Sequence, residues 1–164
     1  NIRFNEKKCH YILCDINISM KDLLTEIATA AGMQIPERVN THGLLKEIVA
    51  YLQTENDHVF MLDEAENLVR RSLDKLDVIR QIWDQTGVTF IIGGTRALQN
   101  ALKSGNKSKS YNSQLYRRLY QAELGAMKPE EVDQYITVLE NTYMVKFMPK
   151  VKAELFDFVG IFST

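Results

Sequence analysis

This sequence contains few cysteines and histidines, and its net charge is close to zero. It has two cysteines and three histidines among 164 residues, and 20 Lys and Arg against 21 Asp and Glu leave a net charge of −1. That balance excludes a polycationic protein, although a local basic patch is still compatible with it. Cys9 and Cys14 fall on one expected strand and point to opposite faces, so we expect no disulfide and no thiolate zinc site. His10, His42 and His58 share no metal-ligand spacing, which favours exposed or structural histidines over metal ligands.

Long apolar runs, low-complexity tracts and a secretory signal are also absent. No run approaches the ~18 residues of a membrane span, so we expect no membrane partner. The chain is rich in core-forming residues, since 45% of it is apolar, and its length suits one ordinary domain. These features are typical of a globular, cytoplasmic protein kept under reducing conditions.

Apolar periodicity predicts alternating strands and helices along the first 95 residues. The expected strands are residues 9–15, 59–63 and 88–92, whose continuous apolar character is typical of parallel strands covered on both faces. The expected helices follow a capping box at Ser19, run from about Thr41 to Gln53, and run from Asp63 to Asp84. This order predicts an α/β fold in which a parallel sheet is sandwiched by helices.

The composition changes after Leu102. Residues 103–113 are rich in Gly, Ser and Asn and predict a polar loop, and residues 114–124 predict a turn of helix followed by a last strand. Pro129 suits the first position of a further helix. We therefore expect a core over residues 1–127 and a second subdomain over residues 128–164.

The segment VFMLDEAENL carries the first candidate chemistry. Asp63 ends a buried strand, and α/β folds place their ligands at the carboxyl ends of such strands. Asp63 is suited to hold Mg²⁺ through a water molecule, and Glu64 to polarise a water for attack on a phosphate, which is the pattern of a Walker B element. The alternative is that both acids only cap the next helix.

Thr95 closes the segment TFIIGGT on the neighbouring strand. A polar side chain there is placed to orient the attacking water beside a γ-phosphate. The alternative is a Gly-Gly turn into a helix that Thr95 caps.

A basic stretch without acidic residues follows. Its charges are Lys103, Lys107, Lys109, Arg117 and Arg118, with tyrosines among and beside them. Such a loop suits contact with a nucleic-acid backbone, and a solvated surface loop is the alternative. Arg117 and Arg118 follow a predicted helical turn, from which one could reach a neighbouring subunit's γ-phosphate as an arginine finger.

The order of these segments resembles the AAA+ ATPases, particularly the DNA-transposition branch typified by the phage Mu B protein and the TnsC and TniB group. The similarity runs from about His10 to Ile136 and rests on VFMLDEAENL, WDQTGVTFIIGGTRALQNAL, the basic loop, QLYRRLYQAEL and KPEEVDQYI. The resemblance implies that Asp63 coordinates Mg²⁺ and Glu64 is the catalytic base. It also implies that Thr95 is sensor 1 and that Arg118, with Arg117 as the alternative, is the arginine finger.

The same resemblance implies cofactors and partners. They are ATP and Mg²⁺, double-stranded DNA contacted by Lys103, Lys107 and Lys109, a transposase, and further copies of the chain in an ATP-dependent oligomer. Residues 128–164 would begin the helical lid.

The sequence departs from this family in one respect. It contains no GxxxxGK[ST] phosphate loop. We therefore expect a strand-loop-helix unit upstream of residue 1, and no ATP hydrolysis by these 164 residues alone. Two other functions stay open. One is an inactive AAA+-like module that binds DNA or protein, and the other is a P-loop ATPase of the replication-initiator or signalling type.

Overall fold

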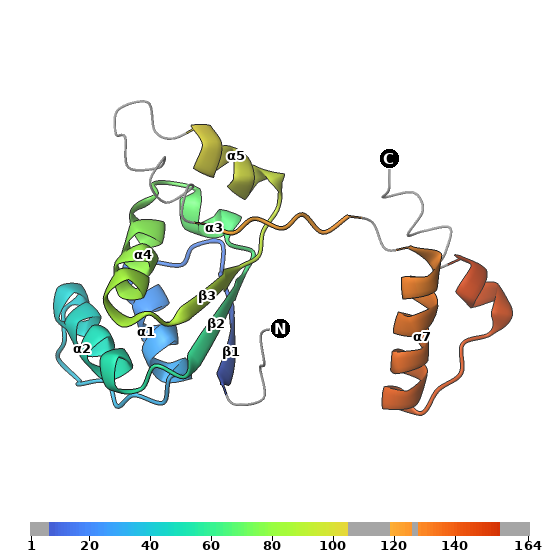
Figure 1. Ribbon diagram of the computed structural model, residues 1–164, viewed down its shortest axis with the longest axis horizontal. Helices are drawn as coiled ribbons and strands as arrows, with labels where there is room; N and C mark the ends of the chain where they lie inside the picture. Colours follow the sequence, from blue (N-terminus) through green and yellow to red (C-terminus); the bar gives the residue numbers. More distant parts are fainter. Residues whose placement is uncertain (1–6, 105–118, 126–127, 155–164) are drawn as a thin grey trace. The chain divides into compact units, whose positions relative to one another are not determined.

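The computed structural model describes residues 7–104, 119–125 and 128–154 (Figure 1). The chain divides into two compact units, residues 1–119 and residues 120–164. The expected boundary near Met127 lies outside the described residues.

The first unit is built on a parallel sheet. Strands β1 (Lys8–Leu13), β2 (His58–Asp63) and β3 (Thr89–Ile92) pair in the order β1-β2-β3. Both pairings are parallel, and their register aligns Tyr11 with Met61 and Met61 with Ile91. The carboxyl ends of the strands therefore meet at one edge of the sheet and the amino ends at the other.

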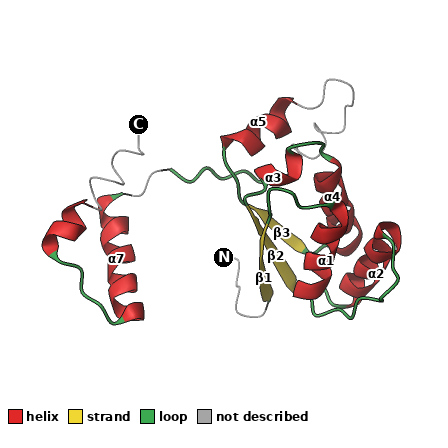
Figure 2. Cartoon of the chain, turned by 180° about the vertical axis from the view of Figure 1, so that it is seen from behind, coloured by secondary structure: helices red, strands yellow, loops and turns green. Residues whose placement is uncertain are grey.

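A layer of helices packs on one face of this sheet (Figures 1 and 2). It consists of α1 (Met20–Ala30), α2 (Thr41–Thr54) and α4 (Asp74–Thr86). Ser19 and Asp22 form the predicted capping box of α1, in which the Ser19 hydroxyl accepts from the Asp22 N–H at 3.1 Å. Phe60 and Leu62 of β2 lie in the same buried cluster as apolar residues of all three helices. The α/β fold class is confirmed.

The opposite face of the sheet is more exposed. Tyr11, Leu13, Met61 and Ile91 alternate with the buried strand residues, and between 37% and 63% of each is exposed. In the described part of the chain, the strands are thus covered mainly on the face that Phe60 and Leu62 occupy.

The single helix expected over Asp63–Asp84 is wrong. The structure has a short helix α3 (Glu66–Val69) and then α4, which begins at Asp74. Arg70 and Arg71 follow α3, where cations favour a helix end. Asp74 and Asp77 lie in the first turn of α4, where acids favour a start. The order of charges therefore suits two helices better than one.

The chain continues beyond the sheet with further helices. Helix α5 (Arg96–Ser104) follows β3, and α7 (Pro129–Tyr143) lies in the second unit, with its predicted start at Pro129 confirmed. The Lys128 N–H donates to Glu131 Oε2 at 2.7 Å at that start. The last strand expected within residues 114–124 is not seen in residues 119–125, the part of it that is described. No helix in the described ranges is both long enough and apolar enough to cross a membrane.

Candidate functional site

Asp63 ends β2 and lies half-buried at the carboxyl edge of the sheet. Its Oδ2 accepts a hydrogen bond from the Tyr11 hydroxyl of β1 at 2.9 Å, and its Oδ1 accepts from the Glu64 N–H at 2.9 Å. The bond to Asp63 raises the pKa of the Tyr11 phenol, because the protonated phenol is the donor. Two donors thus fix the carboxylate in place.

Glu64 follows in an unusual backbone conformation. Its φ is +52°, in the left-handed region that residues other than glycine seldom adopt. Its side chain is exposed, and Oε2 accepts from Asn67 Nδ2 at 3.4 Å. Asn67 Nδ2 also donates to the Cys14 carbonyl at 2.9 Å, which links this turn to the end of β1. Backbone strain of this kind is concentrated at functional sites.

The turn after β3 approaches these acids closely. The Gly93 N–H donates to the Leu62 carbonyl at 2.8 Å, and the Gly93 carbonyl accepts from the Ala65 N–H at 2.9 Å. A Cβ on Gly93 would lie 3.3 Å from Asp63 Oδ1, and one on Gly94 would lie 2.8 Å from Glu66 Oε2. The two glycines therefore leave room that side chains would fill beside the turn Asp63–Glu66, called the acidic turn below.

Thr95 begins α5. Its hydroxyl accepts from the Ala97 N–H at 3.3 Å, so the capped Gly-Gly turn weighed from the sequence is present. The Thr95 N–H donates to Glu66 Oε2 at 3.3 Å, which ties the turn after β3 to the turn after β2. Capping leaves the hydroxyl proton free to donate elsewhere, and the role of Thr95 as a sensor stays a prediction.

The structure brings Asp63, Glu64 and Thr95 to one edge of the sheet and places the other predicted residues as follows. Lys103 is exposed in the last turn of α5. Lys107, Lys109, Arg117 and Arg118 lie outside the described residues, so their roles stay predictions.

The donor set at this edge fits a magnesium ion. Mg²⁺ takes oxygen ligands, keeps several waters and is commonly bound through one or two carboxylates plus phosphate oxygens. Asp63 supplies a fixed carboxylate, Glu64 a second and more exposed one, and Gly93 the adjacent space. These ligands are not accompanied by a phosphate-binding loop, because the sequence contains no GxxxxGK[ST] motif.

Cys14 follows the last residue of β1 and is hydrogen-bonded to the start of the acidic turn. It is fully buried, and its N–H donates to the Asp63 carbonyl at 3.0 Å. Burial, reinforced by the charge of Asp63, raises the pKa of its thiol to about 11. The thiol therefore stays protonated at neutral pH and is not a nucleophile for this site.

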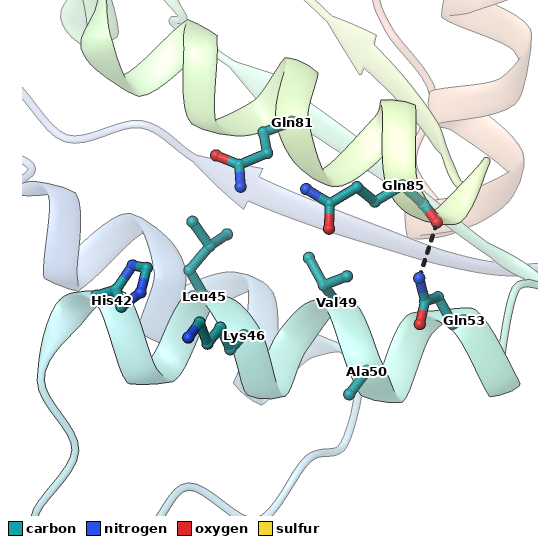
Figure 3. Close-up of a pocket in the computed structure, with 8 residues that line it drawn as sticks. All are labelled: His42, Leu45, Lys46, Val49, Ala50, Gln53, Gln81 and Gln85. Atoms are coloured by element: carbon teal, nitrogen blue, oxygen red, sulfur yellow. Dashed lines mark hydrogen bonds between the residues drawn. The ribbon is translucent and has the colours of Figure 1, made fainter.

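A separate groove lies between α2 and α4 (Figure 3). Gln53 crosses one end of it and donates from Nε2 to the Gln85 carbonyl at 3.2 Å. None of the residues predicted to act on ATP lines this groove. Its lining residues are His42, Leu45, Lys46, Val49, Ala50, Gln53, Gln81 and Gln85.

The sequence reasoning missed a cluster at the amino edge of the sheet. Lys8, His10, Glu55, Asp57 and His58 gather there, with His10 Nε2 2.8 Å from His58 Nδ1. The spacing of the histidines alone gave no signal. The segment Glu55-Asn56-Asp57-His58 does carry one, because it puts three possible metal ligands within four residues at a strand start.

Comparison with known proteins agrees with this arrangement at the level of the family. A search of curated proteins finds no match to the chain. The AAA domain family matches residues 3–102, which is more than half of the 164 residues and includes the sheet and the acidic turn. The chain belongs to the AAA domain family.

Proposed function

We propose that the chain is the core of an ATPase that regulates DNA transposition and hydrolyses ATP in an oligomer on double-stranded DNA. Membership of the AAA domain family supports the general part of this proposal, a nucleotide-binding, ATPase-like function. The observation that carries the catalytic part is the acidic pair Asp63-Glu64 at the carboxyl end of β2, facing the side-chain-free turn at Gly93. The transposition part rests on the resemblance in the order of segments.

The residues of the acidic turn have separate roles in this proposal. Asp63, oriented by Tyr11, holds the hydration shell of Mg²⁺. When bound, Mg²⁺ neutralises charge on the β- and γ-phosphate oxygens. Glu64 accepts a proton from the attacking water, and its exposed carboxylate is accessible for that task. Thr95 donates its hydroxyl proton to the same water while its oxygen caps α5.

The remaining roles involve partners. Arg118, or Arg117 in its place, stabilises the γ-phosphate of the neighbouring copy, so hydrolysis requires the oligomer. Lys103, Lys107 and Lys109 contact phosphates of double-stranded DNA. The oligomer presents the DNA to a transposase.

Hydrolysis is the first test. Because the expected phosphate loop is not among the 164 residues, ATP turnover is measured on the natural protein that contains them, with and without double-stranded DNA. We expect DNA to stimulate turnover, and Glu64→Gln to reduce it at least about 100-fold while ATP still binds. Glu47→Gln, an exposed acid on α2, is the matched control and should leave turnover unchanged. An ATP turnover that is the same with and without DNA would contradict the transposition assignment. Full activity of Glu64→Gln would contradict the role of Glu64 as the base.

DNA contact is tested by salt dependence. Replacing Lys107 and Lys109 together by Ala should reduce the slope of log K against log salt by about two, because each phosphate contact releases about one counterion. Lys46→Ala with Lys75→Ala, which changes the charge equally on α2 and α4, is the control. An unchanged slope in the Lys107/Lys109 variant would rule out that role for the loop.

A further inference from the structure

The cluster at the amino edge of the sheet holds a buried ring nitrogen without a hydrogen-bond partner. His58 begins β2 and only 1% of it is exposed. Its Nδ1 pairs with His10 Nε2 at 2.8 Å, whereas its Nε2 has no hydrogen-bond partner. The nearest acidic atom is Asp57 Oδ1 at 3.6 Å, which is beyond hydrogen-bond distance. Buried polar atoms are normally paired, so this nitrogen calls for an explanation.

The hydrogen bond between the two histidines leaves that nitrogen suitable for a cation. If His58 Nδ1 carries the proton of the 2.8 Å bond to His10, then Nε2 presents a lone pair to the carboxylates. This is the arrangement of metal-binding histidines, whose second ring nitrogen donates to an outer partner that fixes the ring.

The surrounding groups complete a ligand set. Glu55, Asp57 and His58 each offer one ligand atom, and these atoms all lie within 4.8 Å of one another. A cation is already drawn to them, because Lys8 Nζ lies 3.0 Å from Glu55 Oε2 and 3.4 Å from Asp57 Oδ1. About half of the Lys8 side chain is exposed, and exposed ion pairs of this kind are weak. A divalent ion can therefore displace the lysine at little cost.

We propose that Glu55, Asp57 and His58 form a binding site for a divalent transition-metal ion of the Zn²⁺ type, with His10 as the outer partner of His58. One imidazole and two carboxylates are ligands that Zn²⁺ accepts, and the fourth position is left to water. The ligands come from the turn before β2 and from its first residue, and His10 links the site to β1, so the bound ion stabilises the folded sheet. It is distinct from the acidic turn, because the six residues of β2 separate the two by about 16 Å.

The test is calorimetric titration of the 164-residue chain with ZnCl₂ at pH 7, together with thermal unfolding. The exposed Cys9 is replaced by Ser in every variant, so that its thiol cannot bind the ion. We expect one Zn²⁺ per chain and a higher unfolding temperature in its presence. Asp57→Asn should weaken binding at least about tenfold, and His10→Gln about 10- to 100-fold. Lys8→Gln should tighten binding, because it removes the competing cation.

Two controls separate this site from other sources of binding. His42→Gln removes an exposed histidine on α2, and Asp63→Asn removes the acid of the other edge. Both should leave Zn²⁺ affinity unchanged, and failure of the proposed ATPase would not alter that result. All of these variants change side chains that are half-buried or exposed, which keeps the test independent of folding. Equal affinity in Asp57→Asn and His42→Gln, or no gain in Lys8→Gln, would overturn the site.

Discussion

At its carboxyl end, strand β2 presents Asp63 with hydrogen-bond donors on both carboxylate oxygens, whereas at its amino end His58 is buried with one ring nitrogen unpartnered. The carboxyl end is partly open to solvent and continues into a strained residue, Glu64. The amino end is closed by stacked rings and by an ion pair at the surface.

This difference has a physical reason. In a parallel sheet the carboxyl ends of the strands lead into turns that leave the sheet, so their polar groups remain available to ligands. The amino ends receive chain from the preceding helices, and here ring packing between His10, His58 and Phe60 fills that space. One strand thus supports an accessible acidic site at one end and an enclosed nitrogen at the other.

The largest effect on stability is expected from truncating Phe60, which packs the rings of the amino end against the core. Phe60 is fully buried and stacks on His10, His58 and Phe90. Phe60→Ala should lower the free energy of unfolding by about 3–5 kcal/mol. Met61→Ala, on the exposed face of the same strand, should cost less than about 1.5 kcal/mol. Urea unfolding measures both, and similar losses would show that the two faces of the sheet are packed alike.

The two cysteines test the same contrast along β1. Cys9 is exposed near the amino edge, and Cys14 is buried just beyond the carboxyl end with its pKa raised to about 11. At pH 8 such a pKa leaves only about one thiol in a thousand as the reactive thiolate. Iodoacetamide should therefore label Cys14 at least about 100-fold more slowly than Cys9, as mass spectrometry of peptides would show. In urea the two rates should converge, and equal rates in the native chain would mean that Cys14 is not enclosed.

The sequence predicts the carboxyl edge of the sheet better than the amino edge. VFMLD and TFII are continuous apolar runs that end in polar or glycine residues, and this pattern places Asp63 and Thr95 at one edge through the topology alone. The amino-edge cluster depends on register, because Lys8 is opposite His58 only when the strands pair as they do. No local pattern encodes that pairing.

The helix prediction over Asp63–Asp84 was wrong for a related reason. Apolar spacing runs through the segment, yet Glu64 adopts a left-handed conformation and Arg70-Arg71 precede a new acidic start at Asp74. Hydrophobic periodicity does not report such breaks, because it records which face is buried and not where the backbone leaves the helix. The contact between Thr95 and Glu66 across two turns was equally beyond the sequence.

Backbone strain at the carboxyl end is expected to have a smaller effect. Glu64→Gly should raise the free energy of unfolding by about 1 kcal/mol, because glycine adopts φ > 0 without the clash that other residues suffer. Glu64→Ala is the matched control, since it removes the carboxylate and keeps the strain. Stabilisation by Gly and not by Ala, measured in urea, would assign the effect to the backbone. Equal values in the two variants would show that Glu64 is not strained.

The smallest effect is expected at the hydrogen bond from Tyr11 to Asp63, which is distinguished by its dependence on pH. The pKa of the Tyr11 phenol is raised in the folded chain, so the folded chain holds the phenolic proton more tightly than the unfolded chain does. The resulting stabilisation is fully present below the unfolded pKa of about 10 and is lost as pH rises through the higher folded pKa. Tyr11→Phe should therefore lower the urea midpoint slightly at pH 8, and the gap from the unchanged protein should close above pH 10. Tyr120→Phe, which changes a side chain that is 98% exposed, should show no gap at either pH. A gap for Tyr11→Phe that is constant across this range would mean that Asp63 is held in place without the Tyr11 proton.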